Sequence, residues 1–390
     1  MVEFEFWWLL VIPFFFGLGW FAARIDIKQI ISEASDFPVA YFKGLHYLIT
    51  NQYEKAADSF NEAVKLNNNS IELHFALGGL LRRTGQIDKA INLHNDLLET
   101  RELSSNQRES VMAELAQDYF KAGLYDRSED LLSNLRNDKY LQFSLGTLLE
   151  IYERQREWQK AIQIALELEK NSGISFRKAI SHFYCELATE LLIEKKYIEA
   201  KELLDKALNE HKNCVRSNIL LGDISENQGN FEDAISFWKK IEYQKPEYLG
   251  LVAPKILNIF QRQNKTNDGL SLLSRYYDVY KLKTLLDILY ESIINHEGPT
   301  EAEKIARNEL IQRPSLNALD KIFQAKAMAK DDAIEDIELI QQTIKNALGN
   351  RKFYVCSECG FKARQFHWQC PACNGWETLP SEPIDIILDE

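Results

Sequence analysis

The most regular feature of this chain is a large aromatic or aliphatic residue followed three positions later by a small one. The pair recurs through the middle of the sequence at intervals of 34, 38, 33, 39 and 34 residues. Its members are Tyr53/Ala56, Ile87/Ala90, Tyr125/Ser128, Trp158/Ala161, Tyr197/Ala200 and Phe231/Ala234. A small residue lets two helices approach closely, and the large one fills the groove beside it. The pattern therefore predicts a repeated helical unit.

The period resembles that of tetratricopeptide repeats, in which about 34 residues form two antiparallel helices. Gly85, Gly123 and Gly229 lie two positions before the large residue, where one helix must end and the chain must turn. A single unit cannot bury its own apolar face, so stacked neighbours form a continuous core. We therefore expect a superhelical solenoid, a class of fold whose concave surface commonly binds protein segments.

Beyond about residue 250 the repeat pattern weakens, but helical spacing continues to about Leu348. Residues 253–273 and 285–310 are predicted to form divergent helix pairs. Within the array, Trp158 and Trp238 are expected to be core residues.

The N-terminal segment FWWLLVIPFFFGLGWFAA, residues 6–23, contains no charge over 18 residues. As a helix it would be about 27 Å long, close to the roughly 30 Å of a bilayer's hydrocarbon core. A signal peptide needs a basic segment first, but Glu3 and Glu5 precede this run. A buried core helix is the other alternative. Arg24 and Lys28 follow the run, so the positive-inside rule predicts a single-pass anchor with the rest of the chain in the cytoplasm.

Composition narrows the classes of function. The chain has 390 residues and a formal net charge of −12, which disfavours nucleic-acid binding because that needs a basic surface. Only 17 glycines and 9 prolines are present, which favours helices over loop-rich or β-rich folds. No nucleophile–base constellation, phosphate-binding glycine loop or pair of carboxylates in a catalytic context is found. The sequence therefore predicts a protein that is not an enzyme, with no catalytic and no cofactor-binding residue.

Four cysteines close to the C-terminus carry the strongest chemical signal. Cys356 and Cys359, then Cys370 and Cys373, form two C-x₂-C pairs separated by ten residues. Two such pairs suit a closed tetrahedral site for one metal ion, and turns after each pair would aim backbone N–H groups at the thiolates. Iron and zinc both suit four sulfur ligands. A redox motif, a disulfide and a site in which His367 replaces one cysteine are the alternatives.

The remaining cysteines, one histidine and the loop between the cysteine pairs are interpreted as structural or contact residues. His182 and Cys185 are three apart on a predicted helix and are expected to pack between helices rather than to form half of a metal site. Cys214 is interpreted as a lone reduced thiol. The loop between the two cysteine pairs holds several residues that we expect to contact the array or a client protein. These are Lys362, Arg364, Phe366, His367 and Trp368.

Together these features predict an all-α protein, a tetratricopeptide-repeat superhelical solenoid with an N-terminal transmembrane helix and a small C-terminal four-cysteine metal ribbon. The predicted anchor covers residues 1–23 and a juxtamembrane connector covers 24–38. The repeat array covers residues 39–347, and the four-cysteine metal ribbon covers 348–390.

The order of these parts, and several local motifs, resemble the lipopolysaccharide assembly protein B family of Gram-negative bacteria. Besides the N-terminal span, the motifs are AGLYDRSEDLL (122–132), EWQKAI (157–162), HFYCELA (182–188) and CSECGF…HWQCPACNGW (356–376). The resemblance covers essentially the whole chain.

The resemblance implies an inner-membrane protein that restrains lipopolysaccharide synthesis. Family members promote degradation of the deacetylase that commits precursors to lipid A, and a membrane-anchored ATP-dependent zinc protease performs that degradation. Other envelope-synthesis membrane proteins are possible partners, and an oligomer is compatible with the sequence. The family's C-terminal module is described as rubredoxin-like, with four cysteine ligands that correspond to Cys356, Cys359, Cys370 and Cys373.

Three functions follow as hypotheses. The first is an adaptor that holds a client beside a membrane protease. The second is a scaffold that assembles lipopolysaccharide synthesis and transport enzymes without proteolysis. The third is an iron-dependent electron carrier, which the short ten-residue loop between the cysteine pairs disfavours because rubredoxins have a longer one.

Overall fold

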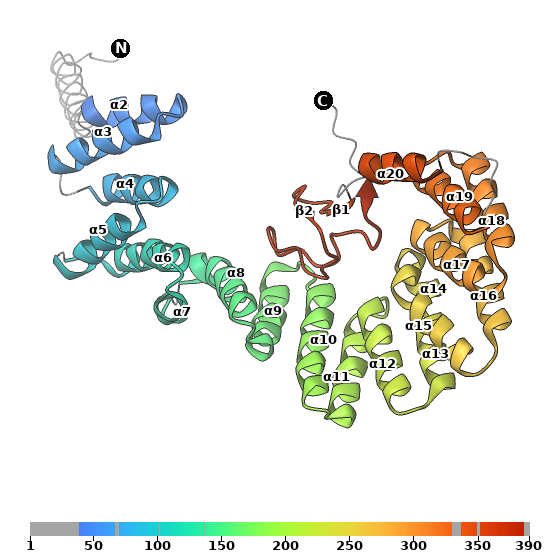
Figure 1. The fold of residues 1–390 in the computed structure, drawn as a ribbon. Coiled ribbons are helices and arrows are strands. Elements are labelled where there is room, and N and C mark those ends of the chain that lie inside the picture. The colour runs from blue at the N-terminus through green and yellow to red at the C-terminus, as the bar shows by residue number, and fades with distance from the viewer. Residues whose placement is uncertain are drawn as a thin grey trace, which may run out of the picture. The chain divides into compact units, whose positions relative to one another are not determined.

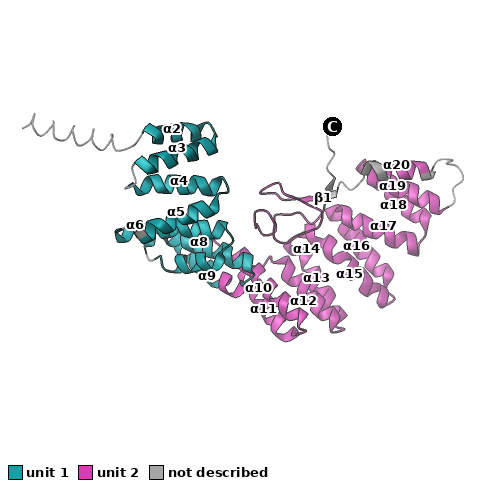
Figure 2. Ribbon diagram, turned by 60° about the vertical axis from the view of Figure 1, so that its left-hand side comes forward, with its two compact units in different colours: residues 1–157, 163–173 teal, residues 158–162, 174–390 magenta. Residues whose placement is uncertain are grey.

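A computed structural model describes residues 39–66, 70–100, 102–135, 137–329, 337–348 and 352–385 (Figure 1). The predicted span at residues 6–23 and the connector lie outside these ranges. Within them, no helix has both the length and the apolar character needed to cross a membrane. The chain divides into two compact units, residues 1–157 with 163–173 and residues 158–162 with 174–390 (Figure 2).

Helices form almost all of the described chain up to Leu348, as the sequence predicts. They are α2 (Val39–Ile49), α3 (Tyr53–Leu66), α4 (Ile71–Arg83), α5 (Ile87–Thr100), α6 (Ser105–Lys121), α7 (Tyr125–Ser133), α8 (Asp138–Gln155), α9 (Trp158–Ser172), α10 (Arg177–Ile193), α11 (Tyr197–Glu210), α12 (Val215–Asn227), α13 (Phe231–Lys239), α14 (Ile241–Gln244), the 3₁₀ turn η1 (Pro246–Tyr248), α15 (Leu249–Arg262), α16 (Thr266–Tyr280), α17 (Lys283–His296), α18 (Pro299–Gln312), α19 (Leu316–Met328) and α20 (Ile337–Leu348).

The six sequence pairs mark the second helix of each repeat. Each large residue is the first residue of a helix, from Tyr53 of α3 to Phe231 of α13. All six small residues are fully buried. Five of these helices, α3, α5, α7, α11 and α13, pack against the helix that precedes them, so the prediction of a repeat array is confirmed for these elements.

A residue in the left-handed region stands two positions before each of these helices. Gly85, Gly123 and Gly229 have φ between +77° and +80°, a conformation that glycine adopts without steric cost. The other three turns place Asn51, Arg156 and Lys195 there, with φ between +57° and +60°. The geometry of the turn is therefore constant although its sequence is not.

The core of the second unit is continuous from α12 to α19. Trp238 on α13 is fully buried, and its indole Nε1 donates a hydrogen bond to the carbonyl oxygen of Ile219 at 3.2 Å. The ring lies directly against Gly222 of α12, where an added Cβ would stand 2.2 Å from Nε1. The absence of a side chain at position 222 is thus what allows α12 and α13 to pack this closely.

Replacing Gly222 with alanine is expected to lower the stability of the second unit by about 1 to 3 kcal/mol, because either the indole or the helix must move. The midpoint of thermal unfolding measures the effect. Gly146→Ala in α8 of the first unit is the control for an alanine at an open helical position, since nothing lies within 4 Å of its added Cβ, and it should be neutral or slightly stabilising. Equal midpoints for the two variants would show that the Trp238 contact is not tight.

Candidate metal centre

The ribbon that follows the array is a three-stranded antiparallel sheet with two turns. Strands β1 (Lys352–Val355), β2 (Lys362–Ala363) and β3 (Ile384–Asp385) lie in the order β2-β1-β3. Cys356 directly follows β1, and an isolated bridge between Gln369 and Trp376 flanks the second cysteine pair. The two cysteine pairs therefore stand at the ends of paired segments, which hold their backbones in place.

Both cysteine turns have the same backbone pattern. In the first, the N–H of Gly360 donates to the carbonyl of Cys356 at 3.0 Å, and Cys356 N–H donates to Phe361 at 2.9 Å. In the second, Asn374 N–H donates to Cys370 at 2.9 Å, and Cys370 N–H donates to Gly375 at 2.9 Å. Gly360 and Asn374 close the turns with φ of +73° and +59°.

The four sulfur atoms lie together as one donor set. Cys356 Sγ is 3.7 Å from Cys373 Sγ, and Cys359 Sγ is 3.7 Å from Cys370 Sγ. All four lie within 4.8 Å of one another. Zinc–sulfur bonds of about 2.3 Å in a tetrahedron require sulfur atoms roughly 3.8 Å apart, so the residues present fit a four-coordinate metal ion. Among the residues that the structure describes, no other group of three or more candidate ligands occurs.

The electrostatics of the four thiols also favour a bound cation. Burial raises the pKa of Cys356, but hydrogen bonds from Thr378 and the backbone N–H groups of Cys359 and Glu358 outweigh it and lower the pKa to about 6. A backbone N–H of Gly375 lowers the pKa of Cys373, yet burial and the three neighbouring sulfurs raise it to about 12. Four thiolates in this volume repel one another unless a cation neutralises them.

This donor set can hold a metal but cannot expose one to a substrate. Four protein ligands fill a tetrahedral coordination sphere, which is the arrangement of structural zinc sites. His367 is exposed and does not belong to the ligand group. The metal would supply folding energy to a ribbon whose buried apolar cluster, among the described residues, is small and includes two of the ligands: Cys356, Ala363, Cys370 and Leu379.

Aromatic side chains join the ribbon to the second unit's helices. Trp368 stacks on Tyr248 of η1 with ring centroids 5.4 Å apart, and Phe366 meets the edge of the same tyrosine at 6.1 Å. Trp376 stacks on His182 of α10 at 4.7 Å with an interplanar angle of 12°. Offset stacks of this kind contribute beyond the area that they bury.

A buried carboxylate of the ribbon lies at the centre of this contact. The Glu377 side chain is fully buried and accepts from His182 Nε2 at 3.1 Å and from Lys245 Nζ, while Lys178 Nζ lies 3.7 Å away. Burial raises the pKa of Glu377, but the hydrogen bonds from His182 and Lys245 and the charge of Lys245 outweigh it and lower the pKa to about 2. Burial lowers the pKa of His182, so at neutral pH its ring is an uncharged donor and Lys245 supplies the compensating charge.

Two further ribbon residues bind backbone groups of the helices. Glu382 accepts from the backbone N–H and the hydroxyl of Thr284, at 2.8 and 2.7 Å, in the first turn of α17. A carboxylate at a helix N-terminus satisfies donors that the helix leaves unpaired. Ser381 donates to the carbonyl of Glu247. Figure 2 shows the ribbon within the same unit as these helices.

The predicted contact loop is confirmed in part. Phe366 and Trp368 pack against the core of the second unit, whereas Lys362, Arg364 and His367 are exposed.

His182 packs in the array as predicted, but its ring also binds the ribbon. Sequence reasoning missed Glu377, Lys245 and Glu382 altogether. The sequence alone does not show whether a single glutamate after a metal motif is buried or exposed to solvent. Only the packed structure brings Glu377 to a lysine 132 positions earlier.

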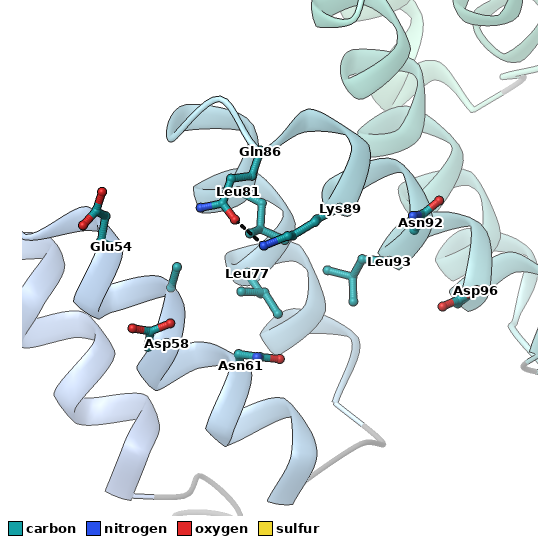
Figure 3. Close-up of a pocket in the computed structure, with 11 residues that line it drawn as sticks. Glu54, Asp58, Asn61, Leu77, Leu81, Gln86, Lys89, Asn92, Leu93 and Asp96 are labelled. Atoms are coloured by element: carbon teal, nitrogen blue, oxygen red, sulfur yellow. Dashed lines mark hydrogen bonds between the residues drawn. The ribbon is translucent and has the colours of Figure 1, made fainter.

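A separate candidate surface lies in the first unit. A groove of about 560 Å³ runs between α3 and α5, with Leu77 and Leu81 of α4 along its floor. Figure 3 shows Asp58 and Asn61 on one wall and Lys89 on the other, with the Lys89 ammonium bonded to Gln86 at 2.8 Å. This groove combines an apolar floor with polar walls.

The groove is acidic. Three of its lining residues are carboxylates, Glu54, Asp58 and Asp96, against the single cation Lys89. In the part of the chain that the structure describes, Glu54 and Asp58 form no ion pair. The surface is therefore complementary in charge to a partner that carries a basic side chain.

Comparison with known proteins supports both parts of the architecture. Residues 354–380 match the family model of a rubredoxin metal binding domain, and residues 37–70 match that of a tetratricopeptide repeat.

Two relatives match almost end to end. Lipopolysaccharide assembly protein B of Escherichia coli (strain K12) is 29% identical over 95% of this chain and 96% of its own length. The protein of the same name from Haemophilus influenzae is 26% identical with the same coverage. Among solved structures, Pseudomonas aeruginosa pilF aligns with 53% of this chain and 91% of its own, at 16% identity and a TM-score of 0.30.

Proposed function

From the premise that the chain belongs to the lipopolysaccharide assembly protein B family, we propose that it is a non-enzymatic adaptor of lipopolysaccharide assembly. It holds the deacetylase that commits precursors to lipid A and presents it to a membrane-anchored ATP-dependent zinc protease. The bulk of the chain lies on the cytoplasmic side of the inner membrane, tethered by residues 6–23.

The observation that supports the proposal is that the buried polar groups of the ribbon serve structural contacts. The four-cysteine site is closed, and the buried ions of the ribbon bind helices rather than face a cavity. A closed metal site and a repeat array are parts for holding surfaces in place. Membrane confinement adds effective concentration for a membrane protease without any new contact.

Loss of the protein is expected to lengthen the lifetime of the deacetylase, because the client is then no longer presented for degradation. A pulse–chase measurement in a depleted Gram-negative host tests this. The full chain should restore rapid turnover, and residues 24–390 at matched abundance should not. An unchanged lifetime on depletion would favour the second candidate, a non-proteolytic scaffold, which the relatives' name supports. Full activity of residues 24–390 would contradict tethering.

The acidic groove of the first unit is the client surface that we propose. Asp58→Lys should weaken binding of the purified deacetylase roughly ten-fold, or about 1.4 kcal/mol, because it reverses one charge beside the groove's apolar floor. Titration by surface plasmon resonance measures the change. Glu62→Lys, on the same helix but outside the groove, is the control. Equal affinities for the two variants would exclude the groove as the client site.

A further inference from the structure

Two buried thiols face each other in the second unit. Cys185 lies on α10 and Cys214 is the residue that caps the N-terminus of α12. Their Sγ atoms are 3.7 Å apart, and both side chains have an exposed fraction of 0%. The prediction that Cys214 is a lone thiol is therefore wrong, because helix packing brings it a partner 29 positions earlier in the chain.

The two thiols have different environments. Cys214 stands at the start of a 13-residue helix, where the unpaired N–H groups favour negative charge. The hydrogen bond from Cys185 lowers the pKa of Cys214, and the backbone N–H of Ser217 lowers it further. Burial raises the pKa of Cys185. One thiol is thus favoured as the thiolate and the other as the neutral donor, the asymmetry found in reactive dithiols.

We propose that Cys185 and Cys214 form a redox-active dithiol that hydrogen peroxide converts to an intramolecular disulfide. The thiolate of Cys214 attacks the peroxide O–O bond, which leaves a sulfenic acid on Cys214 and releases hydroxide, which a proton converts to water. The sulfur of Cys185 then attacks that sulfenic acid, loses its proton and expels the second water. In total, two thiols and one peroxide give one disulfide and two waters, so the thiols lose two electrons to the peroxide.

The geometry requires only a short movement. A disulfide needs its sulfur atoms about 2.05 Å apart, so the pair must close by about 1.7 Å. Because both sulfurs are buried, peroxide reaches them only when α10 and α12 separate, and oxidation is slower than for an exposed thiol. The bond would tie α12 to the helix that carries His182, one turn before Cys185, and so to the helix that binds Glu377 of the ribbon.

The test uses the full-length protein, loaded with zinc so that the ribbon cysteines are ligated. After treatment with hydrogen peroxide, free thiols are alkylated in denaturant and the protein is digested for mass spectrometry. We expect a cross-linked peptide pair that joins Cys185 to Cys214 and separates on reduction. The Cys185→Ser variant should instead accumulate a sulfenic acid on Cys214 that dimedone traps, and Cys214→Ser should show neither product.

Quantitative alkylation of both thiols after peroxide would overturn the proposal, provided that circular dichroism shows an unchanged fold. So would irreversible oxidation of Cys214 without the cross-link, or a disulfide to a ribbon cysteine in its place. Dimedone labelling of Cys185 rather than Cys214 in the single variants would contradict the assigned roles. None of these outcomes depends on the client or on the protease.

Discussion

Cys370→Ser is expected to unfold the ribbon and to release it from the helices of the second unit, while the repeat array stays helical. Cys370 is fully buried, is one of the four candidate ligands, and belongs to the small cluster of buried residues that forms the core of the described ribbon. Metal binding contributes on the order of 10 kcal/mol to the folding of domains this small. Without it, the remaining apolar contacts cannot offset the chain entropy of ordering residues 352–385.

Three measurements test the expected effect of Cys370→Ser. Metal content by mass spectrometry should fall from one ion per chain to none, and hydrogen exchange of residues 352–385 should approach that of an unfolded chain. Far-UV circular dichroism should change little, because the helices lie elsewhere. The Cys185→Ser variant, which changes a buried cysteine outside the ligand group, should keep its metal and its protected ribbon. A Cys370→Ser protein with slow exchange throughout the ribbon would show that docking alone folds it.

The same variant bears on the proposed function. If the ribbon presents a surface for the protease or client, Cys370→Ser should prolong the deacetylase lifetime as much as depletion does. Cys356→Ser and Cys373→Ser should behave alike, because each leaves only three of the four sulfur ligands. Normal turnover in a chain that binds no metal would mean that the array alone performs the regulation.

The repeat array was predictable because its packing rule is local. A large residue at Tyr53 or Phe231 and a small one three positions later are needed wherever two helices approach closely, so the pairs mark the beginnings of helices. The turns could be predicted from the sequence in only half of the cases. A glycine such as Gly85 indicates a residue with positive φ. Arg156 and Lys195 adopt the same left-handed conformation, although their residue types do not predict it.

The candidate metal ligands could also be predicted from local sequence, because the two cysteines of each C-x₂-C turn lie within four residues. The docking of the ribbon could not. Glu377, Glu382 and Lys245 have ordinary surface composition in the sequence, and their partners lie 98 to 195 positions away. Aromatic residues gave a partial signal, since Phe366 and Trp368 are unusual in an exposed loop, which led to the expectation of a contact surface.

Metal binding and docking are expected to reinforce each other. Trp376 and Glu377 follow the last ligand, Cys373, by only three and four residues, so closure of the second cysteine turn fixes the backbone that carries both. A ribbon without metal would have to order this segment during docking itself. The metal therefore prepares the docking surface in advance and reduces the entropy lost when the ribbon binds the array.

Glu377→Gln is expected to weaken docking of the ribbon by about 2 to 3 kcal/mol without loss of the metal. The amide can still accept a hydrogen bond from His182, but the ammonium of Lys245 loses its buried counter-charge. Breaking one partner of a buried ion pair typically costs 3–5 kcal/mol, and Lys245 keeps 27% of its side chain exposed, so water offsets part of that cost. Hydrogen exchange of β1 and of the segment around Trp376 measures the change.

Arg364→Gln is the matched control for Glu377→Gln, because it also removes one charge from the ribbon but at an exposed position. It should leave exchange in the ribbon unchanged. A second variant, Lys245→Met, should be less destabilising when combined with Glu377→Gln than the sum of the single changes, since each has already lost the shared ion pair. Strict additivity of the two substitutions would show that Glu377 and Lys245 do not act on each other, and the ribbon would then be held chiefly by Trp368 and Trp376.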